Sequence, residues 1–198
     1  PIIWGLDVAR YGGDNSALCV RQGNTVLELK SFQSMDLMQL CGAIKNKYDD
    51  CTALERPQEI LIDVIGLGSG VVDRLAEQNL PVRGINVAEA PATKKNYLNL
   101  RAELWFAIKD WLAQRDCRLP NDDELVSELA APIYKYTSSG KIKLESKEEM
   151  RKRGIKSPDK ADALSLTMAS SAASFSGSMS FMGYNFRQPL KSKIIRIG

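Results

Sequence analysis

The amino-acid sequence predicts an α/β domain in which helices flank a mixed five-stranded sheet. Short segments near the N-terminus are apolar or alternate between apolar and polar residues, which is typical of strands. Longer segments carry apolar residues at helical spacing, and between residues 59 and 115 the two kinds of segment alternate along the chain. With 198 residues, the chain is long enough to form one such domain around a hydrophobic core.

The first predicted strands form an antiparallel meander at residues 2–8, 16–22 and 25–32. Two further apolar segments, at residues 59–65 and 81–89, are separated by a helical pattern at 70–78. A strand followed by a helix and another strand predicts a parallel, buried pair. Because the first strand begins almost at residue 1, we expect the chain to be a fragment of a longer protein.

Helical patterns account for much of the remaining chain, at residues 35–50, 96–115, 121–131 and 157–173. Asn121 is the predicted N-cap of the third of these helices, and Ser157 is that of the last, with Pro158 in its first position. Residues 133–145 predict a hairpin that turns at a Ser-Ser-Gly sequence. Residues 174–198 show no periodicity, so we expect a domain at residues 1–173 followed by a basic C-terminal tail.

The composition excludes several classes of protein. The chain contains no histidine, which rules out Ser-His-Asp and Cys-His triads and zinc sites of the HExxH type. Its four cysteines show no CxxC spacing and are expected to be the reduced thiols of a cytosolic protein. No apolar run approaches the roughly 20 residues of a membrane span, and the first residues do not resemble a secretory signal. A hydrolase with this composition must rely on carboxylates, most plausibly by binding metal ions.

Three aspartates occupy positions where a carboxylate is costly unless it is paired or binds a metal ion. Asp7 and Asp63 belong to predicted apolar strands that can lie side by side in the sheet. Asp162 lies among alanines in the predicted last helix, and small neighbours allow a helix to approach a sheet closely. Asp159 shares a helical face with Asp162 and is either a first-turn acid or a further ligand. Oxygen ligands from separate elements suit Mg²⁺ or Mn²⁺.

The net charge is only +3, but basic residues are concentrated toward the C-terminus. Residues 135–160 contain nine Lys or Arg and four Asp or Glu, which suits a polyanionic partner. An isolated charge cluster is more often a solvated surface, but this segment immediately precedes the helix of Asp162. We therefore expect contacts to DNA from Lys141, Lys143, Lys147, Arg151, Lys152, Arg153 and Lys156.

Four segments of the chain resemble, in the same order, the nuclease domain of large terminase subunits, the DNA-packaging motors of tailed bacteriophages. The segments are GLDVARYGGDNSA (5–17), LIDVIGLGSGV (61–71), KNYLNLRAELWF (95–106) and KIKLESKEEMRKRGIKSPDKADALSL (141–166). Within the last of them, SPDKADAL is the most specific part, and the resemblance spans nearly the whole of the predicted domain. It implies a ribonuclease-H-like, resolvase/integrase-like fold. It also implies an endonuclease that cuts concatemeric double-stranded viral DNA during genome packaging with the help of divalent metal ions.

By position, Asp7, Asp63 and Asp162 match the metal-binding carboxylates of this family, and Asp159 matches an accessory position. The resemblance implies two Mg²⁺ or Mn²⁺ ions in the active complex, with Asp7 bridging both. It also implies an N-terminal packaging ATPase domain in the full protein, with the small terminase subunit and the portal as partners in the host cytoplasm. No G-x-x-x-x-G-K-[ST] sequence occurs, so this chain is not expected to hydrolyse ATP.

Two other functions are compatible with the sequence. Residues 5–17 and 62–70 also resemble the phosphate loops of the sugar-kinase and actin class, which shares this core fold but needs two related domains around a cleft. A non-catalytic module that docks on DNA or on the portal is the second alternative, and the presence of all candidate ligands argues against it. The glycine-rich residues 66–70 do not match a dinucleotide-binding G-x-G-x-x-G and are better explained by a tight turn.

Overall fold

The computed structural model describes residues 1–9 and 15–170 of the chain. The predicted C-terminal tail at 174–198 and the last residues of the helix predicted at 157–173 lie outside these ranges. Within the described ranges, no helix combines the length and the apolar character needed to cross a membrane.

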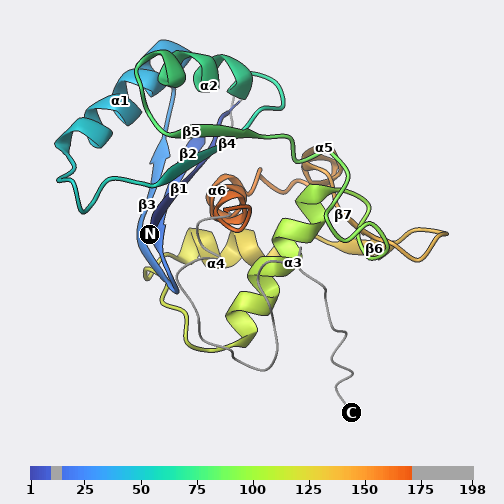
Figure 1. Ribbon diagram of the computed structural model, residues 1–198. Coiled ribbons are helices and arrows are strands. Elements are labelled where there is room, and N and C mark those ends of the chain that lie inside the picture. Colours follow the sequence, from blue (N-terminus) through green and yellow to red (C-terminus); the bar gives the residue numbers. More distant parts are fainter. Residues whose placement is uncertain (10–14, 171–198) are drawn as a thin grey trace.

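The main sheet consists of β1 (Ile2–Asp7), β2 (Ser16–Gln22), β3 (Thr25–Phe32), β4 (Glu59–Asp63) and β5 (Val82–Ile85). These strands lie in the order β3-β2-β1-β4-β5 (Figure 1). β1 is antiparallel to β2 and parallel to β4, and β4 is in turn parallel to β5. The mixed five-stranded sheet predicted from the sequence is therefore confirmed, with β1 at its centre.

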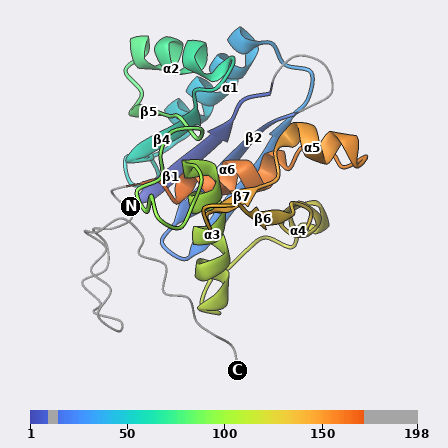
Figure 2. The ribbon, with the colours of Figure 1, turned by 90° about the vertical axis from the view of Figure 1, so that its right-hand side faces the viewer.

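Helices cover both faces of this sheet (Figures 1 and 2). One face carries α1 (Leu37–Asp50) and α2 (Gly68–Glu77). The opposite face carries α3 (Leu100–Ala113), α4 (Asp123–Ala130) and α6 (Asp159–Thr167). Beside α3 lies a two-stranded hairpin, β6 (Tyr134–Tyr136) and β7 (Ile142–Leu144), which is followed by the short helix α5 (Lys147–Lys152). The hairpin predicted at residues 133–145 is thus present.

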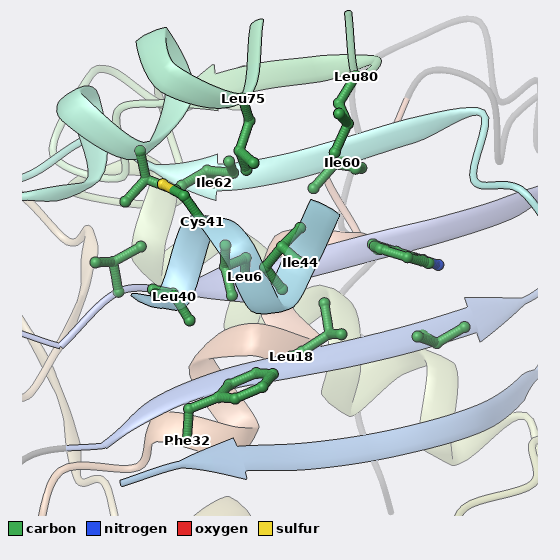
Figure 3. Close-up of a cluster of buried hydrophobic side chains, with 14 of the residues drawn as sticks. Leu6, Leu18, Phe32, Leu40, Cys41, Ile44, Ile60, Ile62, Leu75 and Leu80 are labelled. Atoms are coloured by element: carbon green, nitrogen blue, oxygen red, sulfur yellow. The ribbon is translucent and has the colours of Figure 1, made fainter. Parts of the chain in front are cut away.

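The strands bury side chains on both faces, which accounts for their almost continuously apolar sequences. Leu6, Leu18 and Ile60 point from three neighbouring strands toward Ile44 of α1 and Leu75 of α2, and all five are almost completely buried (Figure 3). Residues of the opposite parity face the other layer of helices, because successive side chains of a strand alternate between its two faces. The central strand is consequently enclosed from both sides.

Helix α6 lies unusually close to β1. A Cβ atom added to Gly5 would be only 2.1 Å from the carbonyl oxygen of Ala163, so only glycine fits between the strand and the helix. On the helix side the contact is made by small residues, and Ala161 and Ala163 are completely buried. This close approach places the first turn of α6 beside the end of β1.

The predicted N-caps of two helices differ from the structure. Asp122, not Asn121, caps α4, because its Oδ1 accepts the backbone N–H of Leu125. Ser157 does not cap α6, which begins after Pro158 without a side-chain cap. A carboxylate from a different helix replaces that cap, since Glu128 of α4 accepts the backbone N–H of Ala161 at 2.8 Å. A partner so distant in sequence has no local sequence signal.

Two predicted elements are shorter than expected. Helix α3 begins at Leu100 instead of residue 96, because the Asn99 side chain caps it by accepting the N–H of Ala102. The preceding backbone joins the hairpin instead, where the N–H of Leu98 donates to the carbonyl of Ile142 at 2.8 Å. Strand β5 covers only four residues of the segment predicted at 81–89.

Replacing Gly5 with alanine tests the contact between β1 and α6. The added methyl group overlaps the backbone of α6, so we expect Gly5→Ala to lower the free energy of unfolding by about 1–3 kcal/mol. The measurement is urea denaturation. Gly42→Ala is the matched control, because nothing lies within 4 Å of its added Cβ and alanine favours a helix by about 1 kcal/mol. Equal stability of the two variants would contradict the close packing.

Candidate metal centre

The four aspartates identified in the sequence come from three elements that meet at one edge of the sheet. Asp7 ends β1 and Asp63 ends β4, and the parallel register pairs Leu6 with Ile62, so both carboxylates emerge at the same edge. Asp159 and Asp162 lie in the first turn of α6. The packing of α6 against β1 brings this turn to the same place.

The ammonium group of Lys147, at the start of α5, lies among three of these carboxylates. Its Nζ is 2.9 Å from Oδ2 of Asp7, 3.1 Å from Oδ2 of Asp162 and 3.9 Å from Oδ1 of Asp159. Asp63 has a different partner, because its Oδ1 accepts the backbone N–H of Ile65 at 3.0 Å. The sequence analysis placed Lys147 among the expected DNA contacts, whereas the structure places it inside the acidic cluster.

Asp162 is held by two side chains of α3 that the sequence analysis did not assign to the site. The indole N–H of Trp105 donates to its Oδ1 at 2.8 Å, and a guanidinium N–H of Arg101 donates to the same oxygen at 3.2 Å. The only signal in the sequence is the spacing of four residues, which puts Arg101 and Trp105 on one face of a helix.

Two carboxylate oxygens of the cluster are buried and accept no hydrogen bond from the described residues. They are Oδ2 of Asp162 and Oδ1 of Asp159, and the Lys147 ammonium approaches both within ion-pair distance. The other oxygen of Asp159 accepts the backbone N–H of Asn15 at 3.0 Å. Buried oxygens without a donor are costly, and oxygen-only donors of this kind suit Mg²⁺ or Mn²⁺. The residues present therefore fit a divalent cation.

The side chains do not stand in a ready-made cage. In the part of the chain that the structure describes, no group of three or more His, Cys, Asp or Glu side chains is arranged to hold a metal ion. The Lys147 ammonium lies where a metal ion would bind and neutralises part of the negative charge of the carboxylates. Binding a divalent ion at this point requires that the ammonium move away.

The pKa values of the cluster reflect burial and the nearby charges. Burial raises the pKa of Asp7, and it raises the pKa of Asp63 and of Asp159 to about 6. Burial acts in the same direction on Asp162, but Arg101, Lys147 and Trp105 outweigh it and lower the pKa of that carboxyl. Burial opposes the charge of Lys147, yet Asp7 and Asp162 hold its pKa above the ordinary value. Asp162 and Lys147 are therefore the charged pair around which the cluster is built.

The remaining expected DNA contacts are distributed outside the centre. Arg153 donates to both side-chain oxygens of Glu145, at 2.6 and 2.7 Å, and Lys143 approaches Glu149 at 3.4 Å. Lys152 is exposed on α5. The basic segment is thus divided between one lysine in the acidic cluster and several cations on the surface beside it.

Comparison with known proteins gives the same fold. No protein-family model matches the chain, and no curated protein matches it in sequence. Among solved structures, the nuclease domain of the large terminase subunit gp2 of bacterial virus Sf6, a K428A mutant with manganese and beta-thujaplicinol, matches with a TM-score of 0.74 and 21% identity. That match covers 85% of this chain and 88% of the other. The large terminase nuclease of thermophilic phage G20c with bound magnesium matches with a TM-score of 0.64 and 16% identity, covering 84% and 79%.

A third match, the large terminase nuclease domain of Thermus phage P74-26, has a TM-score of 0.62 and 15% identity and covers 84% of this chain and 77% of the other. The likeness to all three establishes the fold. The chain has the ribonuclease-H-like α/β fold of phage large terminase nuclease domains, as the sequence predicted.

Removing the lysine charge tests how the cluster is stabilised. Lys147→Met leaves three buried carboxylates facing one another, so we expect the free energy of unfolding near neutral pH to fall by about 3–5 kcal/mol. Mg²⁺ should restore more stability to this variant than to the unaltered protein. Urea denaturation in chelator and in Mg²⁺ measures both effects. Lys143→Met, which alters an exposed ion pair, is the control, and equal losses in the two variants would contradict the assignment.

Proposed function

We propose that this chain is a divalent-metal-dependent endonuclease that cuts double-stranded DNA, specifically the concatemeric viral DNA that a phage packaging motor processes. One observation carries the proposal. Aspartates from three elements meet at one sheet edge, three of them buried, and two of their oxygens accept no hydrogen bond from the residues that the structure describes. The fold shared with large terminase nuclease domains, some of which were crystallised with manganese or magnesium, supports the same conclusion.

In this proposal Asp7, Asp63 and Asp162 hold Mg²⁺ or Mn²⁺, and Asp159 is an accessory ligand. Two bound ions would activate water and stabilise the leaving oxygen of the phosphodiester. The chain's own groups orient these ligands. Backbone N–H groups of Ile65 and Asn15 fix one oxygen each of Asp63 and Asp159. No histidine is required for this chemistry, which agrees with the composition.

Lys147 keeps the acids charged and close together before metal and DNA arrive. Its side chain is 32% exposed, so part of it already lies at the protein surface. In this proposal, the Lys147 ammonium leaves the cluster toward the surface on which DNA binds. There it can contact a phosphate, which reconciles its position with the DNA contact expected from the sequence.

A cleft beside the metal centre supports binding of the DNA backbone. Lys135 and Lys143 lie directly opposite each other in the β6–β7 hairpin, where two like charges repel, and Glu149 approaches only Lys143 among these two in the described ion pairs. Lys152 and Arg153 of the α5 region line the same cleft. Glu145 and Glu149 also line it, so cations outnumber acids by four to two. The sequence analysis missed Lys135, because the contribution of this residue depends on the pairing of the two strands.

The location and partners proposed for this chain are those that its resemblance to terminase nuclease domains implies. We propose that the chain works in the host cytoplasm as part of a protein that also contains a packaging ATPase domain. The small terminase subunit and the portal are its proposed partners.

Plasmid digestion tests the nuclease activity. We expect cutting with Mg²⁺ or Mn²⁺, none with chelator, and a loss of at least about 100-fold in Asp63→Asn. Burial already disfavours the charged form of Asp63, so asparagine should leave the melting temperature unchanged or higher. Asp73→Asn, an exposed acid on α2, is the control. If Asp63→Asn still cuts DNA at the original rate, the ligand assignment is wrong.

Duplex binding in chelator tests the basic cleft separately from catalysis. The double variant Lys135→Ala/Lys152→Ala should bind about tenfold more weakly and reduce the salt dependence of the affinity by about one to two phosphate contacts. Fluorescence anisotropy at several salt concentrations measures both quantities. Lys45→Ala/Arg74→Ala removes two cations from α1 and α2, on the opposite face of the sheet, and should change little. Equal weakening by both double variants would point to net charge alone.

A further inference from the structure

Arg101 and Trp105 form one unit on α3. The guanidinium carbon of Arg101 lies 5.7 Å from the centre of the Trp105 ring, over its face. A second N–H of Arg101 donates to the backbone carbonyl of Glu145 at 2.7 Å, which ties the unit to the segment before α5. Trp105 is 7% exposed, and its ring packs in the cluster between α3, α6 and the sheet. Neither side chain is therefore free to turn away from Asp162.

Both donors of this unit point at the same oxygen of Asp162. The Trp105 indole N–H and the Arg101 guanidinium donate to Oδ1, while Oδ2 lies 3.1 Å from the Lys147 ammonium and accepts no hydrogen bond within residues 1–9 and 15–170. The same division occurs at the two neighbouring acids, where a backbone N–H occupies one oxygen of Asp63 and one of Asp159. Asp162 differs from these two because its donors are side chains, which substitution can remove.

We infer that Trp105 and Arg101 are positioning residues that restrict Asp162 to ligation through one oxygen and thereby favour Mg²⁺ over Ca²⁺. This inference rests on the proposed metal-dependent function. Mg²⁺ requires near-octahedral geometry at short distances, whereas Ca²⁺ accepts six to eight oxygens and is often bound by both oxygens of one carboxylate. A carboxylate whose Oδ1 is held by two donors offers a single oxygen, which suits the smaller ion.

Trp105→Phe removes the indole donor while keeping an aromatic ring in the core. We expect Mg²⁺ affinity to fall by about 10–100-fold, as is usual when the partner of a ligand is lost. Ca²⁺ affinity should fall much less or rise, because only Arg101 then holds Oδ1 of Asp162 and this oxygen is less restricted. Calorimetric titration of the DNA-free protein with each ion separately gives the ratio of the two affinities, which loss of packing alone would not change.

The controls separate this inference from a general effect on folding and from the proposed function. Trp111→Phe makes the same change on the same helix, but the indole N–H of Trp111 donates to Asn24, away from the centre. Arg101→Gln removes the other donor without changing the core ring and should shift the ratio in the same direction. An unchanged ratio in Trp105→Phe and Arg101→Gln, or equal weakening of both ions, overturns the inference. Failure of the unaltered protein to bind Mg²⁺ or cut DNA would instead reject the proposed function.

Discussion

The close packing of α6 on β1 is the contact on which the rest of the structure depends. With no side chain at Gly5, the helix backbone lies directly against the central strand, and this brings Asp162 beside Asp7. Alanines on the helix complete the contact. A larger residue on either side would separate the two carboxylates as well as the two elements. The distance between α6 and β1 therefore determines both the packing of the helix and the distance between the Asp7 and Asp162 carboxylates.

Charged side chains hold α6 at both of its ends. Glu128 accepts the backbone N–H of Ala161 in the first turn, and the buried Arg21 donates to the side chain and the carbonyl of Thr167 at the last. An acid at the N-terminus and a base at the C-terminus each complement the helix dipole. Burial raises the pKa of Glu128 to about 7, so this acid is retained despite a cost. The helix is thus fixed along its axis as well as against the sheet.

The sequence predicted correctly those helices and strands that local sequence patterns specify. Apolar strands and the alanines of α6 are local features, and each indicated an element that the structure contains. The turn predicted at residues 66–70 is shorter than expected, because Gly68 and Gly70 already belong to α2. The predicted boundaries failed where a distant residue replaced a local one. Glu128, and not the predicted Ser157, accepts a backbone N–H at the start of α6. Residue 96, predicted to begin a helix, instead pairs with the hairpin. Such partners differ by tens of residues along the chain, and no single-sequence pattern records them.

The sequence by itself determined which carboxylates are costly in their elements, because an aspartate within an apolar strand or an alanine-rich helix stands out from its neighbours. It also determined that the proposed chemistry must proceed without histidine. Only the tertiary structure decided that one oxygen each of Asp159 and Asp162 accepts no hydrogen bond from the described residues. It also decided that Lys147, Arg101 and Trp105 surround Asp162. The reason is geometric, since hydrogen bonds act over about 3 Å and depend on how elements far apart in sequence are oriented.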